Sequence, residues 1–151
     1  MDQIMEIVRK CDVCSLAFFD DEYPYIVPLN FGAAIEDGRL FLYFHGADAG
    51  RKLRLMDMRP TVGFEMHHTG RLLLSDRACK ATMDYESVCG SGMAERVEGP
   101  AKRKALNVLM EQYTGLPEHE FEEKEVDGVC VFRVAVHEVY GKKKVTGWIP
   151  D

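Results

Sequence analysis

The sequence lacks the features that mark several large classes of protein. No apolar run approaches the roughly 20 residues that a bilayer-spanning helix needs, and the first residues lack the basic and apolar regions of a signal peptide. Positive charge is also scarce: 19 Lys and Arg against 25 Asp and Glu give a net charge of −6, whereas a general nucleic-acid binder needs a basic face. The five cysteines are odd in number and irregularly spaced, which indicates reduced thiols rather than a disulfide framework. We therefore expect a soluble, cytoplasmic protein whose partners include neither a membrane nor a nucleic acid.

What is present is the composition of an ordinary globular domain. The 151 residues are 46% hydrophobic and 29% charged, which suits a folded chain and excludes a disordered or collagen-like one. Neither an internal repeat nor a change of composition divides the sequence. We therefore expect a single domain over residues 1–151.

The hydrophobic pattern predicts strands in hairpin order with a few helices. Apolar runs predict strands at residues 13–19, 23–35, 39–45, 61–67, 72–74, 80–97 and 129–140. Spacing and end signals predict helices at residues 1–10, at 48–58 with Asp48 as the cap, and from Pro100 to Gly115. Pro24 and Pro28 lack ladder donors, which predicts that the second strand lies at an edge or is bulged there. The pattern predicts an α+β fold: an antiparallel barrel of six or seven strands with peripheral helices.

The stretch with the most chemical information joins the third strand to the next helix. The strand ends at His45, a loop of small residues follows, and the helix opens with Gly50, Arg51 and Lys52. Cations in a first helical turn oppose the helix macrodipole, which favours Asp or Glu there. Two cations beside free backbone N–H groups would suit a phosphate; alternatively, they solvate the outer face of the helix. The spacing fits neither a P-loop nor a GxGxxG dinucleotide site.

Two further stretches combine polar residues with glycines. Asn30 lies in an apolar strand, where its amide needs a partner, and Gly32 would let a flat ligand approach the backbone; alternatively, Asn30 bonds its own sheet edge. Ser87 could donate to a phosphate or a ring, and Gly90 and Gly92 could open room for a ligand. The alternative is that these two glycines bend a long strand.

The cysteines and histidines allow a metal interpretation that other features oppose. Cys11 and Cys14 have zinc or redox spacing, and His67 and His68 could supply two more ligands. However, Cys14 begins an alternating strand, and no second CxxC or HxxxH accompanies the pair. We therefore expect no metal and interpret all five cysteines as packing residues. Glu65 is expected to be solvated or paired with a nearby base.

Four stretches in order carry a resemblance to a known family. They are Pro24-Tyr-Ile-Val-Pro-Leu-Asn-Phe, Leu42-Tyr-Phe-His-Gly-Ala, Gly50-Arg-Lys and Tyr85-x-Ser-Val-x-Gly-x-Gly. From about Cys11 to Lys142, the chain resembles the pyridoxamine 5′-phosphate oxidase-like flavoproteins, and within them the Nim-type (5-nitroimidazole resistance) branch. The resemblance implies a split β-barrel, a homodimer, and FMN bound at the dimer interface by both subunits.

The resemblance also implies roles for individual residues. It implies that Asn30, Phe31 and Gly32 line the isoalloxazine ring and that His45, Gly46 and Ala47 pass beside the flavin. Arg51 and Lys52 are implied to hold the flavin phosphate. Ser87 and Val88 are implied to close the site. His45 is implied as the functional histidine of Nim-type relatives and hence as the catalytic residue. Two residues depart from the family pattern: Glu86 stands in place of a common Arg, and Gly46 in place of a common Ser.

The implied function is that of an FMN-dependent reductase. Electrons would pass from a nicotinamide donor, NAD(P)H, to a small acceptor such as a nitroimidazole or another nitroaromatic, with His45 as proton donor. The alternatives are a non-catalytic flavin-binding or redox-sensing module, a barrel that binds deazaflavin or heme, an empty barrel, and pyridoxamine 5′-phosphate oxidation. The last is disfavoured because residues 139–151 contain no evident Arg/His cluster. Residues 142–144 and Trp148 form a basic, aromatic tail that either reaches a partner subunit or frays.

Overall fold

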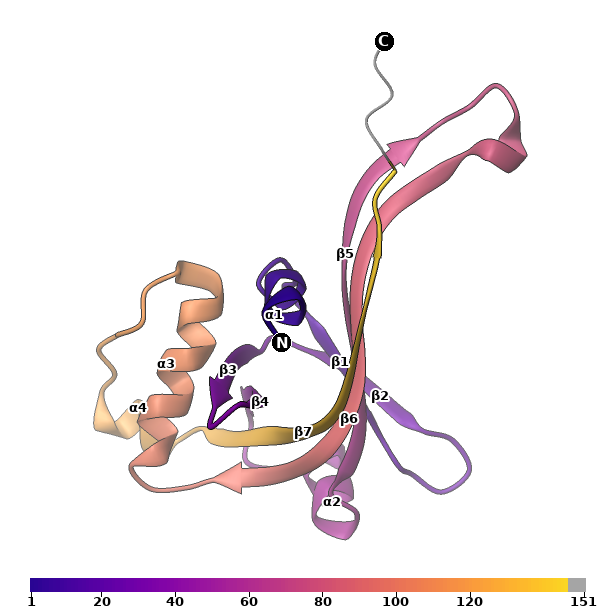
Figure 1. Ribbon diagram of the computed structural model, residues 1–151. Coiled ribbons are helices and arrows are strands. Elements are labelled where there is room, and N and C mark those ends of the chain that lie inside the picture. The colour runs from indigo at the N-terminus through magenta and orange to yellow at the C-terminus, as the bar shows by residue number, and fades with distance from the viewer. Residues whose placement is uncertain (147–151) are drawn as a thin grey trace.

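The computed structural model describes residues 1–146 (Figure 1). Its strands are β1 (Cys14–Phe18), β2 (Tyr25–Leu29), β3 (Gly32–Glu36), β4 (Arg39–Gly46), β5 (Thr61–Leu73), β6 (Thr82–Val97) and β7 (Cys130–Lys144). Its helices are α1 (Asp2–Val8), α2 (Arg51–Met58), α3 (Ala101–Thr114) and α4 (Glu123–Asp127), with a 3-10 turn, η1, at Ala78–Lys80. In this part of the chain, no helix has the length and apolar character needed to cross a bilayer. Trp148 lies outside the described residues.

The seven strands form one antiparallel sheet in the order β2-β1-β5-β6-β7-β4-β3. Its two edge strands, β2 and β3, follow each other in the chain and are joined by Asn30 and Phe31 alone. Because a link of this length spans at most roughly 11 Å, the two edges of the sheet come close together. The sheet therefore curls into a barrel that is split between β2 and β3. This confirms the predicted α+β split barrel, and it confirms the edge position of the strand that contains Pro28.

The structure differs from the predicted elements in three places. The expected strand 23–35 is two strands, because the chain crosses from one sheet edge to the other at Asn30 and Phe31. The expected strands 61–67 and 72–74 are one strand, β5, with a register shift between Thr69 and Leu72. The short helix α4, which the pattern did not predict, lies between α3 and β7.

Strands β5, β6 and β7 extend beyond the barrel as a long, bent arm (Figure 1). In this arm Lys142 pairs in register with Ser87, and Lys143 pairs with Glu86. Residues 142–144 thus continue β7, an inner strand of the sheet, and do not fray.

The main core lies inside the barrel, between the sheet and α1. Phe44 of β4 and Phe132 of β7 stack there, with ring centroids 5.1 Å apart. A second apolar cluster lies on the opposite face of β4, under α3, and consists of Tyr43, Val97, Ala105, Leu109 and Val131. Strand β4 is therefore buried on both faces, which holds its last residues, His45 and Gly46, in a fixed position.

Candidate functional site

Helix α2 begins without a side-chain cap from the described residues. Its N-cap residue, Gly50, has φ of +132°, a backbone conformation that favours glycine, and the first turn contains no acidic residue. The prediction of Asp48 as the cap is wrong: it lies two residues before the N-cap, and its carboxylate is 3.6 Å from the guanidinium of Arg96. The first-turn N–H groups and the positive end of the macrodipole are therefore available to an anion.

The two cations at this helix start have different surroundings. Nε of Arg51 donates a hydrogen bond to Oδ2 of Asp20 at 2.8 Å, and the guanidinium lies 4.7 Å from the ring centroid of Tyr25. The hydrogen bond from Arg51 holds the pKa of the Asp20 carboxyl below its usual value. Nζ of Lys52, in contrast, lies against Gly46, where a Cβ atom would be 3.0 Å from it. Lys52 is thus the cation that can meet a phosphate, since the charge of Arg51 is already balanced.

A shallow pocket of about 320 Å³ lies where β4 ends, beside the link between β2 and β3. His45 from β4, Asn30 from the link, and Leu109, Met110 and Tyr113 from α3 line it. The helix supplies an apolar wall, while the amide and the imidazole supply polar groups. This combination suits a flat ligand that has an apolar face and a polar edge. The structure thus brings together Asn30 and His45, two of the residues implied as flavin contacts.

Asn30 is also bonded within the chain, although not to its own sheet edge as the alternative interpretation expected. Its Nδ2 donates to the backbone oxygen of Asp12 at 3.2 Å and to the hydroxyl of Tyr113 at 3.3 Å. That hydroxyl in turn accepts a hydrogen bond from the backbone N–H of Phe31 at 2.9 Å and donates one to Asp12 at 2.8 Å. Sequence reasoning missed Tyr113, because its helical spacing with Leu109 made it look like one more core residue.

Packing restricts the surroundings of Phe31 and Gly32. The side chain of Phe31 is fully buried in the core. A Cβ atom on Gly32 would lie 2.4 Å from the backbone oxygen of Val108. Helix α3 therefore occupies the space above Gly32, and the expectation that this glycine lets a flat ligand approach is wrong.

Replacing Gly32 with alanine is expected to lower the free energy of unfolding by roughly 1–3 kcal/mol, the range seen for overpacked sites. The reason is the contact of 2.4 Å with Val108, which forces α3 away from β3. Denaturant unfolding measures the change. Gly63→Ala is the matched control, because the atom nearest to its added Cβ is 3.9 Å away. Equal stability of the two variants would contradict the packing role of Gly32.

Ser87 and Val88 do not line the pocket that contains His45. Val88 is fully buried in the core. Ser87 points to the opposite face of β6, where its register partners are His67 on β5 and Lys142 on β7. Within one described chain, neither residue closes the candidate site.

The glycines that follow on β6 serve packing and bending, as the alternative interpretation expected. A Cβ atom on Gly90 would lie 2.3 Å from the backbone oxygen of Glu138 and 2.5 Å from the ring of Phe64. A Cβ atom on Gly92 would lie 2.4 Å from the backbone oxygen of Ala135, and the register with β7 shifts at this point. These positions hold no open space for a ligand.

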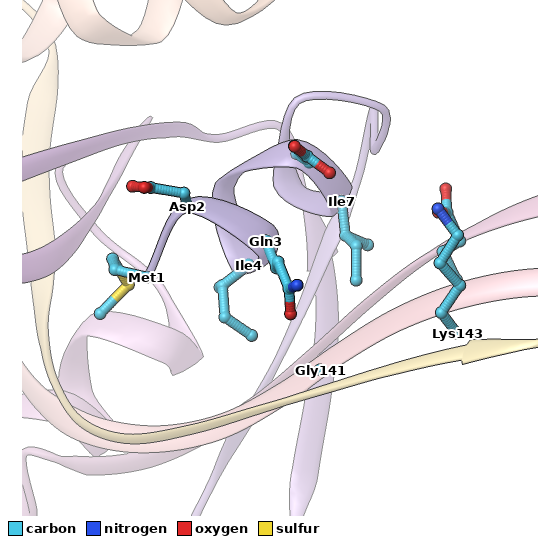
Figure 2. Close-up of a pocket in the computed structure, with 9 residues that line it drawn as sticks. Met1, Asp2, Gln3, Ile4, Ile7, Gly141 and Lys143 are labelled. Carbon is cyan, nitrogen blue, oxygen red and sulfur yellow. The ribbon is translucent and has the colours of Figure 1, made fainter.

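A second pocket, of about 650 Å³, lies between α1 and the arm, with Ile4 and Ile7 on the helix side and Lys143 on the strand side (Figure 2). The buried carboxylate of Glu86 lines it and is 2.5 Å from Nζ of Lys10 and 2.6 Å from Nζ of Lys143. Hydrogen bonds from these two ammonium groups hold the pKa of Glu86 below its usual value. Glu86, which departs from the family pattern, thus joins the turn after α1 to the arm.

The thiols at the start of β1 are packing residues, as predicted. Cys11 and Cys14 are buried, and burial raises the pKa of Cys11 to about 11 and raises that of Cys14 as well. The expectation of packing also holds for Cys130 but is wrong for Cys79 and Cys89, which are exposed.

The acidic and histidine side chains near β1 form a pair rather than a larger cluster. Glu65 and His67 form a hydrogen bond, with Oε1 and Nδ1 2.7 Å apart, which agrees with the expectation of a basic partner for Glu65. Over residues 1–146, no group of three or more His, Cys, Asp and Glu side chains is arranged to hold a metal ion.

Comparison with known proteins places the chain in a family. Residues 1–143 match the family model of pyridoxamine 5′-phosphate oxidase. The structure is similar to that of a candidate 5-nitroimidazole antibiotic resistance protein from Bacteroides thetaiotaomicron, with a TM-score of 0.78 and 29% sequence identity over 93% of this chain and 81% of that one. No protein of curated function matches the sequence.

Two more distant structures share the fold. They are the flavocytochrome Anf3 from Azotobacter vinelandii (TM-score 0.76, 17% identity, 100% of this chain and 70% of that one) and the FAD- and heme-binding protein from Mycobacterium smegmatis (TM-score 0.74, 18% identity, 99% and 73%). The match of the family model over nearly the whole chain is the decisive finding. The chain belongs to the pyridoxamine 5′-phosphate oxidase family.

Proposed function

We propose that the protein binds FMN and acts as a reductase that passes electrons from NAD(P)H to a small acceptor such as a nitroimidazole or another nitroaromatic. One observation carries the proposal: at the end of β4, consecutive residues belong to two sites of different chemistry, His45 to the pocket and Gly46 to the surroundings of Lys52. The uncapped start of α2 with Lys52 suits a phosphate, and the pocket with Asn30 and His45 suits a ring with a polar edge. FMN carries both parts in one molecule, so the residues present fit this cofactor.

The known relatives support the same assignment. The Mycobacterium smegmatis protein that shares the fold binds FAD and heme, and the Bacteroides thetaiotaomicron protein is a candidate 5-nitroimidazole resistance protein. A flavin and a nitroaromatic acceptor are the ligands that these two likenesses favour. The terminal phosphate of FMN is the anion that the start of α2 would hold.

The residues of this chain would bind the phosphate, orient the ring and protonate the acceptor. The first-turn N–H groups of α2 and the ammonium of Lys52 would hold the phosphate, and Asn30 would bond the edge of the ring. Met110 and Leu109 would cover an apolar face and exclude water. A bound FMN would supply the transfer of electrons from a nicotinamide to an acceptor, and the exposed imidazole of His45 would donate a proton to that acceptor.

We further propose that the protein is a homodimer with the flavin at its interface. Ser87 lies on the outer face of β6, away from the core and outside the pocket of its own chain. It can therefore contact a flavin only from a second copy. The same face carries Tyr140 on the neighbouring strand, 66% exposed. Light scattering on the purified protein should give twice the chain mass of 17.2 kDa, and a monomeric mass would contradict the shared site.

The reductase activity is tested on the flavin-loaded protein under anaerobic conditions. Addition of NADH or NADPH should bleach the visible flavin band, and addition of a 5-nitroimidazole should restore it. If the FMN-loaded protein is neither reduced by a nicotinamide nor reoxidised by a panel of nitroaromatics, the reductase function is wrong, and the non-catalytic flavin module is favoured instead.

A further inference from the structure

The hydroxyl of Tyr113 lies at the centre of a small hydrogen-bond network at the split of the barrel. It accepts a hydrogen bond from the backbone N–H of Phe31 and donates its single proton to the backbone oxygen of Asp12. Phe31 lies in the two-residue link between the sheet edges, so its N–H is outside the strand ladders. Tyr113 supplies the partner that this N–H needs, and it ties α3 to the start of β1 and to the link.

The same network decides which way the amide of Asn30 faces. Both neighbours of its Nδ2, the oxygen of Asp12 and the hydroxyl of Tyr113, accept hydrogen bonds from it, at 3.2 and 3.3 Å. If the amide were flipped, Oδ1 would take the place of Nδ2. It would then face two groups that offer it no proton: the backbone oxygen of Asp12, and the hydroxyl of Tyr113, which already donates its proton to that oxygen. An amide is assigned by such a network. The two protons of Asn30 are therefore used inside the chain, and Oδ1 is left for a ligand.

We propose that Tyr113 is a positioning residue that holds Asn30 as a hydrogen-bond acceptor at the pocket, so that the pocket selects a ring edge that carries an N–H. Asn30 and Tyr113 both line this pocket, beside His45. An acceptor at this place binds a donor and repels a carbonyl or a bare ring nitrogen. The specificity of the pocket thus depends on a helix residue that acts through a neighbouring amide.

This inference rests on the proposed function, and it makes that function more specific. The oxidised isoalloxazine ring has one N–H group, at N3 between its two carbonyls, and its other ring nitrogens are acceptors or carry substituents. If FMN fills the pocket, the Oδ1 atom of Asn30 meets N3–H. The chain then recognises the pyrimidine edge of the flavin through a single side-chain acceptor, whose orientation Tyr113 controls.

The test compares FMN with 3-methyl-FMN, in which a methyl group replaces the hydrogen on N3. The affinity of the apo-protein for each is measured by flavin fluorescence. Wild-type protein should prefer FMN by roughly threefold to tenfold or more, the value of one hydrogen bond, and Tyr113→Phe should reduce this preference. Tyr23→Phe is the matched control, because this tyrosine lies 71% exposed in the turn between β1 and β2.

A double-mutant cycle separates positioning from general support of the fold. In an Asn30→Ala background, Tyr113→Phe should leave the FMN preference unchanged, because the acceptor that it orients is gone. Asn30→Ala alone keeps the bonds of Tyr113 to Phe31 and Asp12, so it tests the acceptor even if Tyr113→Phe unfolds. Thermal unfolding of each apo-protein reports its stability separately.

Each outcome has a definite meaning. A preference that shrinks in Tyr113→Phe and Asn30→Ala but not in Tyr23→Phe supports the inference. Equal binding of the two flavins by wild-type protein overturns it while leaving the proposed function intact, as does a preference that Tyr113→Phe does not change. Failure of wild-type protein to bind either flavin overturns the inference and the proposed function together.

Discussion

Replacing Lys52 with alanine is expected to weaken FMN binding by roughly tenfold to hundredfold. A hydrogen bond from a charged group contributes roughly 1.5–3 kcal/mol, and about 1.4 kcal/mol corresponds to a factor of ten. Lys52 lies against Gly46 at the start of α2, where no described side chain caps the helix. Arg51→Ala is expected to have the smaller effect, since Arg51 is already paired with Asp20. Fluorescence titration of the apo-protein measures both.

Riboflavin, which lacks the phosphate, gives the control for the ligand. Its affinity should be the same for wild-type protein and Lys52→Ala. Arg54→Ala is the control for the helix, because Arg54 lies on α2 and its side chain donates to Met58 within the same helix. If Lys52→Ala binds FMN as tightly as wild-type protein, or loses riboflavin to the same degree, the phosphate does not lie at this helix start.

Replacing His45 with alanine is expected to slow the reduction of a nitroaromatic by about 100-fold or more, which is the low end of the range for general acid–base groups. His45 is exposed at the pocket and provides the imidazole there. The measurement is the anaerobic reoxidation of the flavin-loaded variant, after reduction by NADH, with a 5-nitroimidazole as acceptor. His45→Gln should show a similar loss, because an amide fills much of the space but cannot release a proton as an imidazolium does.

Ferricyanide is the control acceptor in this experiment, because it takes up electrons without a proton. Its reaction with the reduced protein should change little in His45→Ala. A parallel loss with both acceptors would show that the substitution disturbs the flavin itself, and an unchanged rate with the nitroaromatic would remove His45 as proton donor.

The barrel could be predicted from the sequence because each strand carries its own local signal. Alternating residues and the Asp37-Gly38 turn, with positive φ at both positions, specify β4 and its hairpin without reference to the rest of the chain. The break at Asn30 and Phe31 has no such signal, since apolar residues stand on both sides of Asn30. The break results from closure of the sheet, because its two edge strands, β2 and β3, lie at opposite ends of the strand order and are joined by these two residues.

The candidate site could be predicted only where the residues that form it are close in sequence. The segment from His45 to Lys52 is one continuous stretch, so its pattern of small and basic residues could be recognised as a candidate phosphate site. The ion pair of Arg51 with Asp20 joins residues 31 positions apart, and Tyr113 lies 83 positions from Asn30. Such pairings depend on the packing of α2 and α3 on the barrel, which hydrophobic periodicity does not encode.

The most direct test of the account is the identity of the cofactor in the purified protein. The absorption spectrum is recorded first; the protein is then denatured by heat, and the released compound is identified by its mass. The account predicts flavin bands and the mass of FMN. A colourless protein that takes up no added FMN would contradict it, and release of FAD, a deazaflavin or heme in place of FMN would contradict the assignment of FMN as the cofactor.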